Sequence, residues 1–270
     1  MYNFTYHRPT GLRQAGNMLT KLEDAKLLAG GQTLIPVMKQ RLASPTNIVD
    51  LNKIDGLAGI ELKGRSLVIG AMTRHVDVAN SEVVKANLPA LAELAEMVGD
   101  PHVRHRGTLG GSIANNDPNA DYPAACLGLG ATIITNKRRI KADDFFTGMF
   151  STALEPTEII TKVSFPIPKK AAYQKFRNQA SRFALVGVFV SKRGSDIRVA
   201  VTGAGANGVF RVPSFEEALK KRFSPKSLEG LSIPADGMNS DIHGSAEYRA
   251  HLVGVLARRA VADAIGKPIA

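Results

Sequence analysis

The chain has 270 residues, of which 44% are hydrophobic and 22% charged, so it is expected to fold into one or two globular domains rather than stay disordered. Its one cysteine, Cys126, excludes internal disulfides and any iron–sulfur or zinc site made of cysteines alone. The net charge of +11 comes from dispersed bases with few aromatic residues, which favours an acidic protein partner or solubility over nucleic-acid binding.

No apolar run approaches the roughly 18 residues that a membrane span needs, so we expect no membrane span. The first residues also lack the charged-then-apolar layout of a signal peptide. The expected compartment is the cytoplasm.

The first third of the chain alternates between helical and extended patterns. Residues 14–28 carry apolar side chains at helical spacing, and residues 25–51 read as a strand, a Gly-Gly turn, a helical turn and a second strand. Two β-like runs around Lys63-Gly64-Arg65 predict a hairpin. A strong helix is predicted over 88–99, with Pro89 in its first turn and Gly99 as its cap.

The rest of the chain continues the mixed pattern. A helix of small residues after Asp121 leads into a strand pair turned at 136–137, and the strand Ile159–Phe165 is closed by prolines 166 and 168. Two strands joined by 192–196 form another predicted hairpin, and helices are predicted at about 214–222 and 245–265. The prolines mark a candidate boundary between two domains.

Two glycine segments of similar chemistry lie about 80 residues apart in the sequence. Consecutive amides at Ala29-Gly30-Gly31-Gln32-Thr33 could cradle an anion, although an ordinary strand-to-helix turn is the better explanation of that segment taken alone. Gly107, Gly110 and Gly111 stand too close together for a regular element, so we expect a second turn, with hydroxyls at 108 and 112. Such a pair suits a pyrophosphate held from two sides, with Asp121 as an acceptor for a hydroxyl.

A third glycine cluster, Gly203 to Gly208, matches the dinucleotide-binding pattern G-x-G-x-x-G. That fingerprint needs a helix to start at its last glycine. The residues that follow, 209–212, include two valines, and Pro213 comes directly after them, so a helix is not expected there. We therefore expect a turn rather than a nucleotide site. His102 and His105 stand among arginines that would repel a metal ion, and Cys126 lies in an apolar run typical of a core thiol.

Residues 27–54 and 104–133 resemble the two FAD-binding segments of the flavoprotein (medium) subunit of molybdenum hydroxylases, the carbon monoxide dehydrogenase and xanthine dehydrogenase family. The likeness continues through residues 158–166, 173–188, 198–219 and 241–261, so it spans nearly the whole chain in order. It implies an α+β fold with an FAD-binding domain of the vanillyl-alcohol-oxidase (PCMH) type over 1–168, in subdomains of about 1–55 and 56–168. A C-terminal domain with a three-stranded antiparallel sheet and helices would cover 169–270.

The resemblance also implies the cofactor site and two departures from the family. Gln32 stands where relatives often have histidine, so a covalent flavin is not expected, and Phe183 replaces a tyrosine beside the isoalloxazine but keeps an aromatic ring. No catalytic or metal-binding side chain is implied. The implied FAD contacts are Ala29, Gly30, Gly31, Gln32, Thr33, Thr108, Leu109, Gly110, Gly111, Ser112, Asp121, Ile160, Lys175 and Phe183.

The implied function is electron relay. Hydroxylation would occur at a molybdenum cofactor in a large subunit, and electrons would pass through [2Fe-2S] clusters in a small subunit to this FAD and on to an external acceptor (quinone, NAD⁺ or O₂). The implied assembly is a dimer of heterotrimers. Two other hypotheses stay open at this point: an NAD(P)-dependent dehydrogenase built on residues 203–208, and a flavin-free scaffold subunit.

Overall fold

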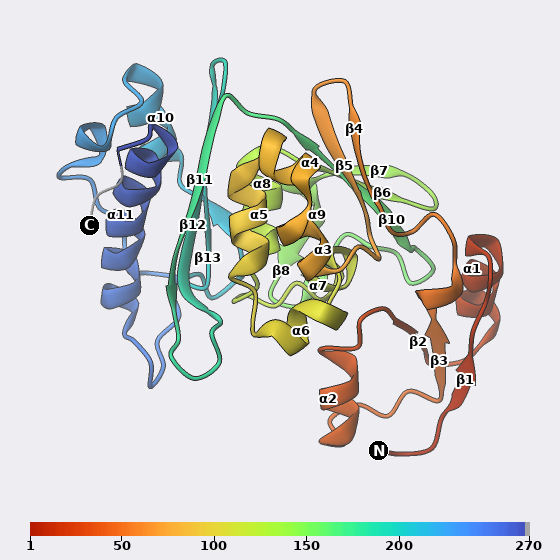
Figure 1. Cartoon of the computed structure of the whole chain (residues 1–270). Coiled ribbons are helices and arrows are strands. Elements are labelled where there is room, and N and C mark those ends of the chain that lie inside the picture. Colours follow the sequence, from red (N-terminus) through yellow and green to blue (C-terminus); the bar gives the residue numbers. More distant parts are fainter. Residues whose placement is uncertain (268–270) are drawn as a thin grey trace.

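The computed structural model describes residues 1–267 and shows an α+β protein (Figure 1). A small parallel sheet at the N-terminus is followed by a five-stranded antiparallel sheet and then by a four-stranded antiparallel sheet near the C-terminus. The predicted fold class is confirmed. Within the described residues, no helix is long and apolar enough to cross a membrane.

The N-terminal sheet has the strand order β1-β3-β2, all parallel. The predicted strand–turn–helix–strand series over 25–51 is confirmed, but the helix expected over 14–28 ends at Lys21. Residues 25–28 form strand β2 and pair with β3 instead. The apolar residues keep a helical spacing beyond Lys21, but pairing with a neighbouring strand outweighs this local preference. The elements are β1 (Thr5–His7), α1 (Leu12–Lys21), β2 (Ala25–Leu28), α2 (Leu34–Lys39), β3 (Asn47–Asp50) and the 3-10 turn η1 (Leu51–Lys53).

The five-stranded sheet has the order β4-β5-β10-β6-β7 and contains both hairpins predicted in this part of the chain. β10 lies between them and pairs with β5 and β6, so it joins segments that are far apart in the sequence. A separate two-stranded hairpin, β8-β9, lies between β7 and β10 in the sequence. The strands are β4 (Ile60–Lys63), β5 (Ser66–Gly70), β6 (Thr132–Thr135), β7 (Arg139–Lys141), β8 (Phe146–Gly148), β9 (Ser151–Thr152) and β10 (Ile160–Pro166).

Seven helices accompany this sheet within the described residues. The helix predicted over 88–99 is present but ends at Glu96. Five of the seven helices were not predicted: α3, α4, α6, α7 and α9. In α6 and α7 the prolines and glycines are typical helix breakers, but each helix begins at a capping side chain, Asp100 or Thr108. The helices are α3 (His75–Asn80), α4 (Glu82–Asn87), α5 (Pro89–Glu96), α6 (Pro101–Arg106), α7 (Leu109–Asn115), α8 (Tyr122–Leu129) and α9 (Ala142–Phe145).

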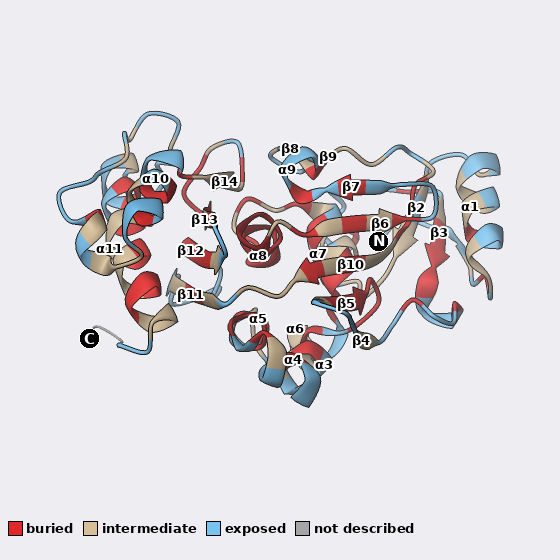
Figure 2. Cartoon of the chain, turned by 90° about the horizontal axis from the view of Figure 1, so that it is seen from above, coloured by how far each residue is buried: buried red, intermediate tan, exposed pale blue. Residues whose placement is uncertain are grey.

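Helix α8 is buried along its whole length, as its red colour in Figure 2 shows. It contacts β10 on one side and β12 and β13 of the C-terminal sheet on the other. Small residues are needed for this position, since a Cβ at Gly128 would lie 2.7 Å from the ring of Phe189. The helix therefore joins the two larger sheets into one packed body.

The C-terminal sheet has four strands in the order β11-β12-β13-β14, which corrects the expected three. The additional strand, β14, is only two residues long and pairs with the end of β13, so no alternating pattern marks it in the sequence. Helix α11 covers one face of this sheet and α8 the other (Figure 1). The elements are β11 (Lys170–Arg177), β12 (Ala184–Arg193), β13 (Asp196–Thr202), β14 (Phe210–Arg211), α10 (Pro213–Lys221), the 3-10 turn η2 (Pro225–Leu228) and α11 (Ala246–Ala264).

Candidate functional site

A cavity of about 710 Å³ lies where the N-terminal unit, the five-stranded sheet and the C-terminal sheet meet. That volume is typical of sites for cofactor-sized ligands. Of the fourteen residues implied by sequence, twelve line it, and the structure brings them together from five separate segments. The twelve are Ala29, Gly30, Gly31, Gln32, Thr33, Thr108, Gly110, Gly111, Ser112, Asp121, Ile160 and Phe183.

The first glycine segment connects β2 to α2 and presents unused amides. The backbone N–H groups of residues 30–33 have no hydrogen-bond acceptor among the described residues. Gly31 has a positive φ of 73°, a left-handed conformation that favours glycine. Four successive free donors beside a cavity form a concave site for an anion such as a phosphate.

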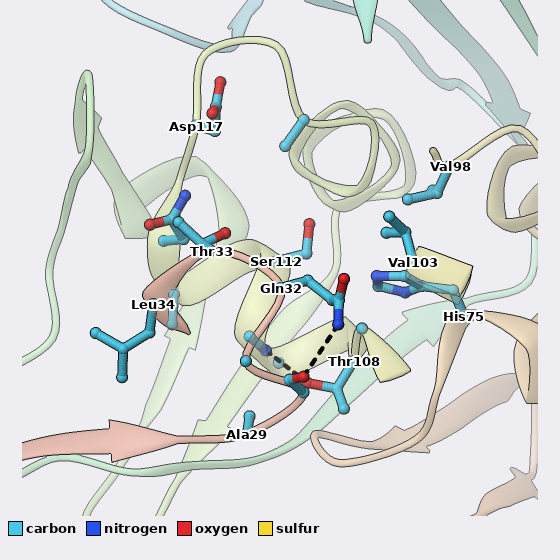
Figure 3. Close-up of a pocket in the computed structure, with 18 of the residues that line it drawn as sticks. Ala29, Gln32, Thr33, Leu34, His75, Val98, Val103, Thr108, Ser112 and Asp117 are labelled. Atoms are coloured by element: carbon cyan, nitrogen blue, oxygen red, sulfur yellow. Dashed lines mark hydrogen bonds between the residues drawn. The ribbon is translucent and has the colours of Figure 1, made fainter. Parts of the chain in front are cut away.

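The second glycine segment behaves differently, because it is the start of helix α7 rather than the expected turn. The amides of residues 109–112 are all used within the protein: Leu109 N donates to Thr73 O (3.0 Å), Gly110 N to Ala71 O (2.8 Å) and Ser112 N to Thr108 O (3.0 Å). Gly111 N donates to the Thr108 hydroxyl at 3.2 Å. What this segment offers the cavity is the side chain of Ser112, which points into it in Figure 3.

The structure also explains why glycines stand in these segments. A Cβ at Gly30 would overlap the carbonyl oxygen of Arg106 and lie 2.7 Å from its carbonyl carbon. A Cβ at Gly110 would lie 2.5 Å from the Cβ of Ala71. These two glycines allow protein backbones to approach each other. At Gly111 a Cβ would lie 2.9 Å from the Thr108 hydroxyl oxygen and 3.6 Å from Ala29 Cβ, and this glycine lines the cavity.

Two of the fourteen residues do not line the cavity. Leu109 is fully buried in the core of the five-stranded sheet. Lys175 is also buried, and its ammonium donates to Asp121 Oδ2 at 2.9 Å and to Met97 O at 3.0 Å. Lys175 therefore ties β11 to the cavity wall rather than entering the cavity.

Asp121 lies in the cavity wall, but both its oxygens already have partners. Oδ1 accepts from the Tyr173 hydroxyl at 2.5 Å and Oδ2 from Lys175. Burial raises the pKa of the Asp121 carboxyl, and the Lys175 ammonium and the Tyr173 hydroxyl oppose that rise. Removal of one member of such a buried pair is costly, since it leaves the other charge unpaired.

The C-terminal sheet positions further parts of the cavity wall. The Thr202 hydroxyl donates to Ala120 O (2.6 Å) and Pro118 O (3.0 Å), and Gly203 N donates to Pro118 O (2.8 Å). These bonds hold the loop before α8. Phe183, 49% exposed between β11 and β12, adds an aromatic ring to the rim.

Several lining residues were not identified from the sequence. His75 and Val103 lie at one end of the cavity in Figure 3, and Asp117 at another. Glu158 also lines it, but its carboxylate is held by Arg138, whose hydrogen bond lowers the pKa of Glu158 to about 2. No spacing in the sequence marks these residues, because they come from unrelated segments that the fold brings together.

The third glycine cluster is a structural turn, as expected. Gly203 has φ +83°, its carbonyl accepts from the buried Arg249 guanidinium at 2.9 Å, and the chain continues from Gly208 into β14. Since no helix starts at Gly208, the hypothesis of an NAD(P)-dependent dehydrogenase built on residues 203–208 is wrong. Among residues 1–267, no group of three His, Cys, Asp or Glu side chains is placed to hold a metal ion.

Comparison with known proteins assigns the fold and the family. Residues 2–168 match the FAD binding domain in molybdopterin dehydrogenase, and residues 171–264 match the CO dehydrogenase flavoprotein C-terminal domain. The chain belongs to the family of FAD-binding medium subunits of molybdenum hydroxylases. The family expected from the sequence is confirmed.

Relatives and solved structures agree over nearly the full length of this medium subunit. It is 35% identical to the carbon monoxide dehydrogenase medium chain of Hydrogenophaga pseudoflava and 38% identical to the nicotine 6-hydroxylase medium subunit of Paenarthrobacter nicotinovorans, with 96% of each chain covered. A structure of carbon monoxide dehydrogenase from Hydrogenophaga pseudoflava superposes with a TM-score of 0.87 at 34% identity, covering 99% of both chains. Quinoline 2-oxidoreductase from Pseudomonas putida 86 gives a TM-score of 0.83 at 28% identity, covering 97% of both.

The residues present fit FAD, the cofactor of this family. The free amides of residues 30–33 suit a pyrophosphate, and the hydroxyls of Thr33 and Ser112 point into the same space (Figure 3). Apolar side chains such as Val98, Val103 and Phe183 line other parts of the cavity and suit a flat ring system.

Proposed function

We propose that this medium subunit binds one FAD in the cavity and passes electrons through it to an external acceptor. The electrons come from [2Fe-2S] clusters of a small subunit, and the substrate is hydroxylated at a molybdenum cofactor in a large subunit. Support comes from the relatives, which are medium chains of a carbon monoxide dehydrogenase and a nicotine hydroxylase. FAD supplies the redox chemistry, and the protein supplies binding and orientation.

One observation carries the proposal: four successive backbone donors without a protein acceptor lie in a cavity with twelve of the residues implied for FAD. In this assignment the amides of residues 30–33 hold the pyrophosphate, and the Thr33 and Ser112 hydroxyls bind neighbouring oxygens. Ile160 and Phe183 pack on the cofactor. Leu109, Asp121 and Lys175 contribute by positioning the wall, since their side chains are already engaged in the protein.

Three further features of the assembly belong to the proposal. A division into residues 1–55, 56–168 and 169–270 is supported by the sheets, because the strands of each sheet fall within one of these ranges. The proposed assembly contains two copies of each of three subunits, and the mass of the purified complex, measured by light scattering, tests it. Cell fractionation tests the proposed cytoplasmic location.

The first experiment is purification of the complex through a tag on this chain, followed by acid precipitation. We expect about one FAD per chain in the supernatant, since Gln32 does not form a covalent link, together with iron–sulfur absorbance from the other subunits. Protein that carries no flavin and takes up none when FAD is added would favour the scaffold hypothesis instead.

A charge introduced in the cavity tests the site itself. Gly111→Asp places a carboxylate beside the proposed pyrophosphate and is expected to abolish FAD binding. Gly11→Asp is the matched control, because it adds the same charge outside the cavity, ahead of helix α1, where φ is −138° and a Cβ meets nothing within 4 Å. Normal flavin content in Gly111→Asp would overturn the assignment of this cavity.

A further inference from the structure

One buried polar side chain in the cavity wall has no partner in the protein. His75, the first residue of α3, is 4% exposed and lines the cavity. Neither of its ring nitrogens has a hydrogen-bond partner among residues 1–267, and Nδ1 is completely enclosed. Buried polar groups in folded proteins are nearly always paired, so this ring is suited to a partner that enters the cavity.

A second unpaired group belongs to the side chain whose ring packs against this one. The Tyr122 hydroxyl is buried and also lacks a partner among the described residues, and the two rings pack at a tilt of 37° with centroids 5.3 Å apart. Four buried side-chain atoms in the described chain are unpaired, on His75, Asn116, Tyr122 and Arg249. Of these residues, His75 is the one found in the cavity lining.

The chemistry of the two groups is complementary. Burial and the nearby Arg104 lower the pKa of His75 to about 4, so at neutral pH its imidazole carries one N–H and one acceptor nitrogen. Burial raises the pKa of Tyr122, which stays a phenol and can donate. If the phenol donates to Nδ1, the imidazole proton must be on Nε2, the nitrogen beside Gly107 in the cavity wall.

We propose that His75 donates from Nε2 to the bound FAD, and that Tyr122 is a positioning residue that donates to His75 Nδ1 and fixes the ring in that orientation. This inference rests on the proposed function, because it takes FAD as the molecule in the cavity. The structure described has no Tyr122–His75 hydrogen bond, so the inference requires the phenol and the imidazole to move into hydrogen-bond distance when FAD binds. Binding of FAD then pairs two buried groups that otherwise stay unpaired.

The test is FAD affinity of the apoprotein, measured by quenching of flavin fluorescence, beside the unfolding midpoint of the same apoprotein. Tyr122→Phe is expected to leave the apoprotein at least as stable and to weaken FAD binding about fivefold, and His75→Leu about tenfold. His75→Gln retains a donor near the Nε2 position and should bind FAD within about threefold of wild type. The exposed Tyr248→Phe is the matched control and should change neither quantity.

Two further readouts separate this pair from a packing role. The double variant should bind FAD no more weakly than His75→Leu alone, since the two residues act as a unit. The reduction potential of the bound flavin should shift in His75→Leu and return in His75→Gln. The inference is overturned if Tyr122→Phe binds FAD within twofold of wild type, or if the two single effects simply add. Wild-type protein that binds no FAD would contradict the proposed function instead.

Discussion

The two glycine segments beside the cavity have similar sequences but different backbone hydrogen bonding. In residues 30–33 the amides have no acceptor in the described protein, whereas in residues 109–112 every amide donates to a protein oxygen. The first segment therefore offers donors to a ligand, and the second forms the rigid surface beside it. Closely spaced glycines show that something approaches the backbone, but not whether it is a ligand or the protein itself.

The largest effect should come from Gly30→Ala. The added Cβ would overlap the Arg106 carbonyl, and neither backbone can move without separating the two segments. We expect the free energy of unfolding to fall by about 3 kcal/mol and FAD binding to be lost with it. Urea unfolding of the apoprotein measures the first quantity and flavin content the second.

Gly16→Ala in helix α1 is the control for that variant. Its Cβ would have one ordinary contact, at 3.6 Å from Asn136, so the higher helix propensity of alanine should stabilise the protein by up to about 1 kcal/mol. If Gly30→Ala were as stable as Gly16→Ala, close packing between the two segments would not be the reason for the glycine.

Neighbouring glycines in α7 give a sharper comparison. Gly110→Ala places a Cβ 2.5 Å from that of Ala71 and should destabilise the apoprotein by about 1–3 kcal/mol. In Gly111→Ala the Thr108 hydroxyl must rotate away, which costs about 1 kcal/mol of capping, but alanine regains about as much through helix propensity. Thermal unfolding of both variants should separate them clearly, and equal losses would contradict the assignment of Gly111 to the cavity side.

Much of the fold could be predicted because its signals are local. Turn residues and apolar spacing predicted the hairpins around Gly64 and residues 136–137 and the long helix α11. They also predicted a fold class that mixes strands and helices. Helix α7 was missed because Gly110 and Gly111 read as breakers, although Thr108 caps its start. Strand β14 is too short to leave a pattern.

The cavity was predicted by its segments rather than by its contacts. Residues 29–33 and 108–112 were identified, but their different hydrogen bonding depends on Ala71 and Thr73, which no local pattern links to them. The resemblance pointed to Asp121 and Lys175 as cofactor contacts, and the structure shows that they pair with each other. His75 could not be found from the sequence, because a single histidine indicates a ligand site only when the structure shows that it is buried and has no hydrogen-bond partner.

Thr108→Val tests whether the cap belongs to the protein or to the ligand. The hydroxyl accepts from Gly111 N in the structure, so its loss should lower the stability of apoprotein and FAD-bound protein alike, by about 1 kcal/mol. Urea unfolding with and without FAD measures both. A stable apoprotein with weakened FAD binding would instead assign the hydroxyl to the cofactor.

The smallest effect on stability should come from Ser112→Ala. The Ser112 hydroxyl has no hydrogen-bond partner among residues 1–267 and points into the cavity (Figure 3), so its removal should leave the unfolding of the apoprotein unchanged. If it binds a cofactor oxygen, the dissociation constant of FAD should rise about fivefold to tenfold. Thr108→Val and Ser112→Ala thus have opposite expected outcomes although both remove a hydroxyl from one segment. A change in apoprotein stability with unchanged FAD affinity would show that α7 contributes structure alone and that the ligand contacts lie in residues 30–33.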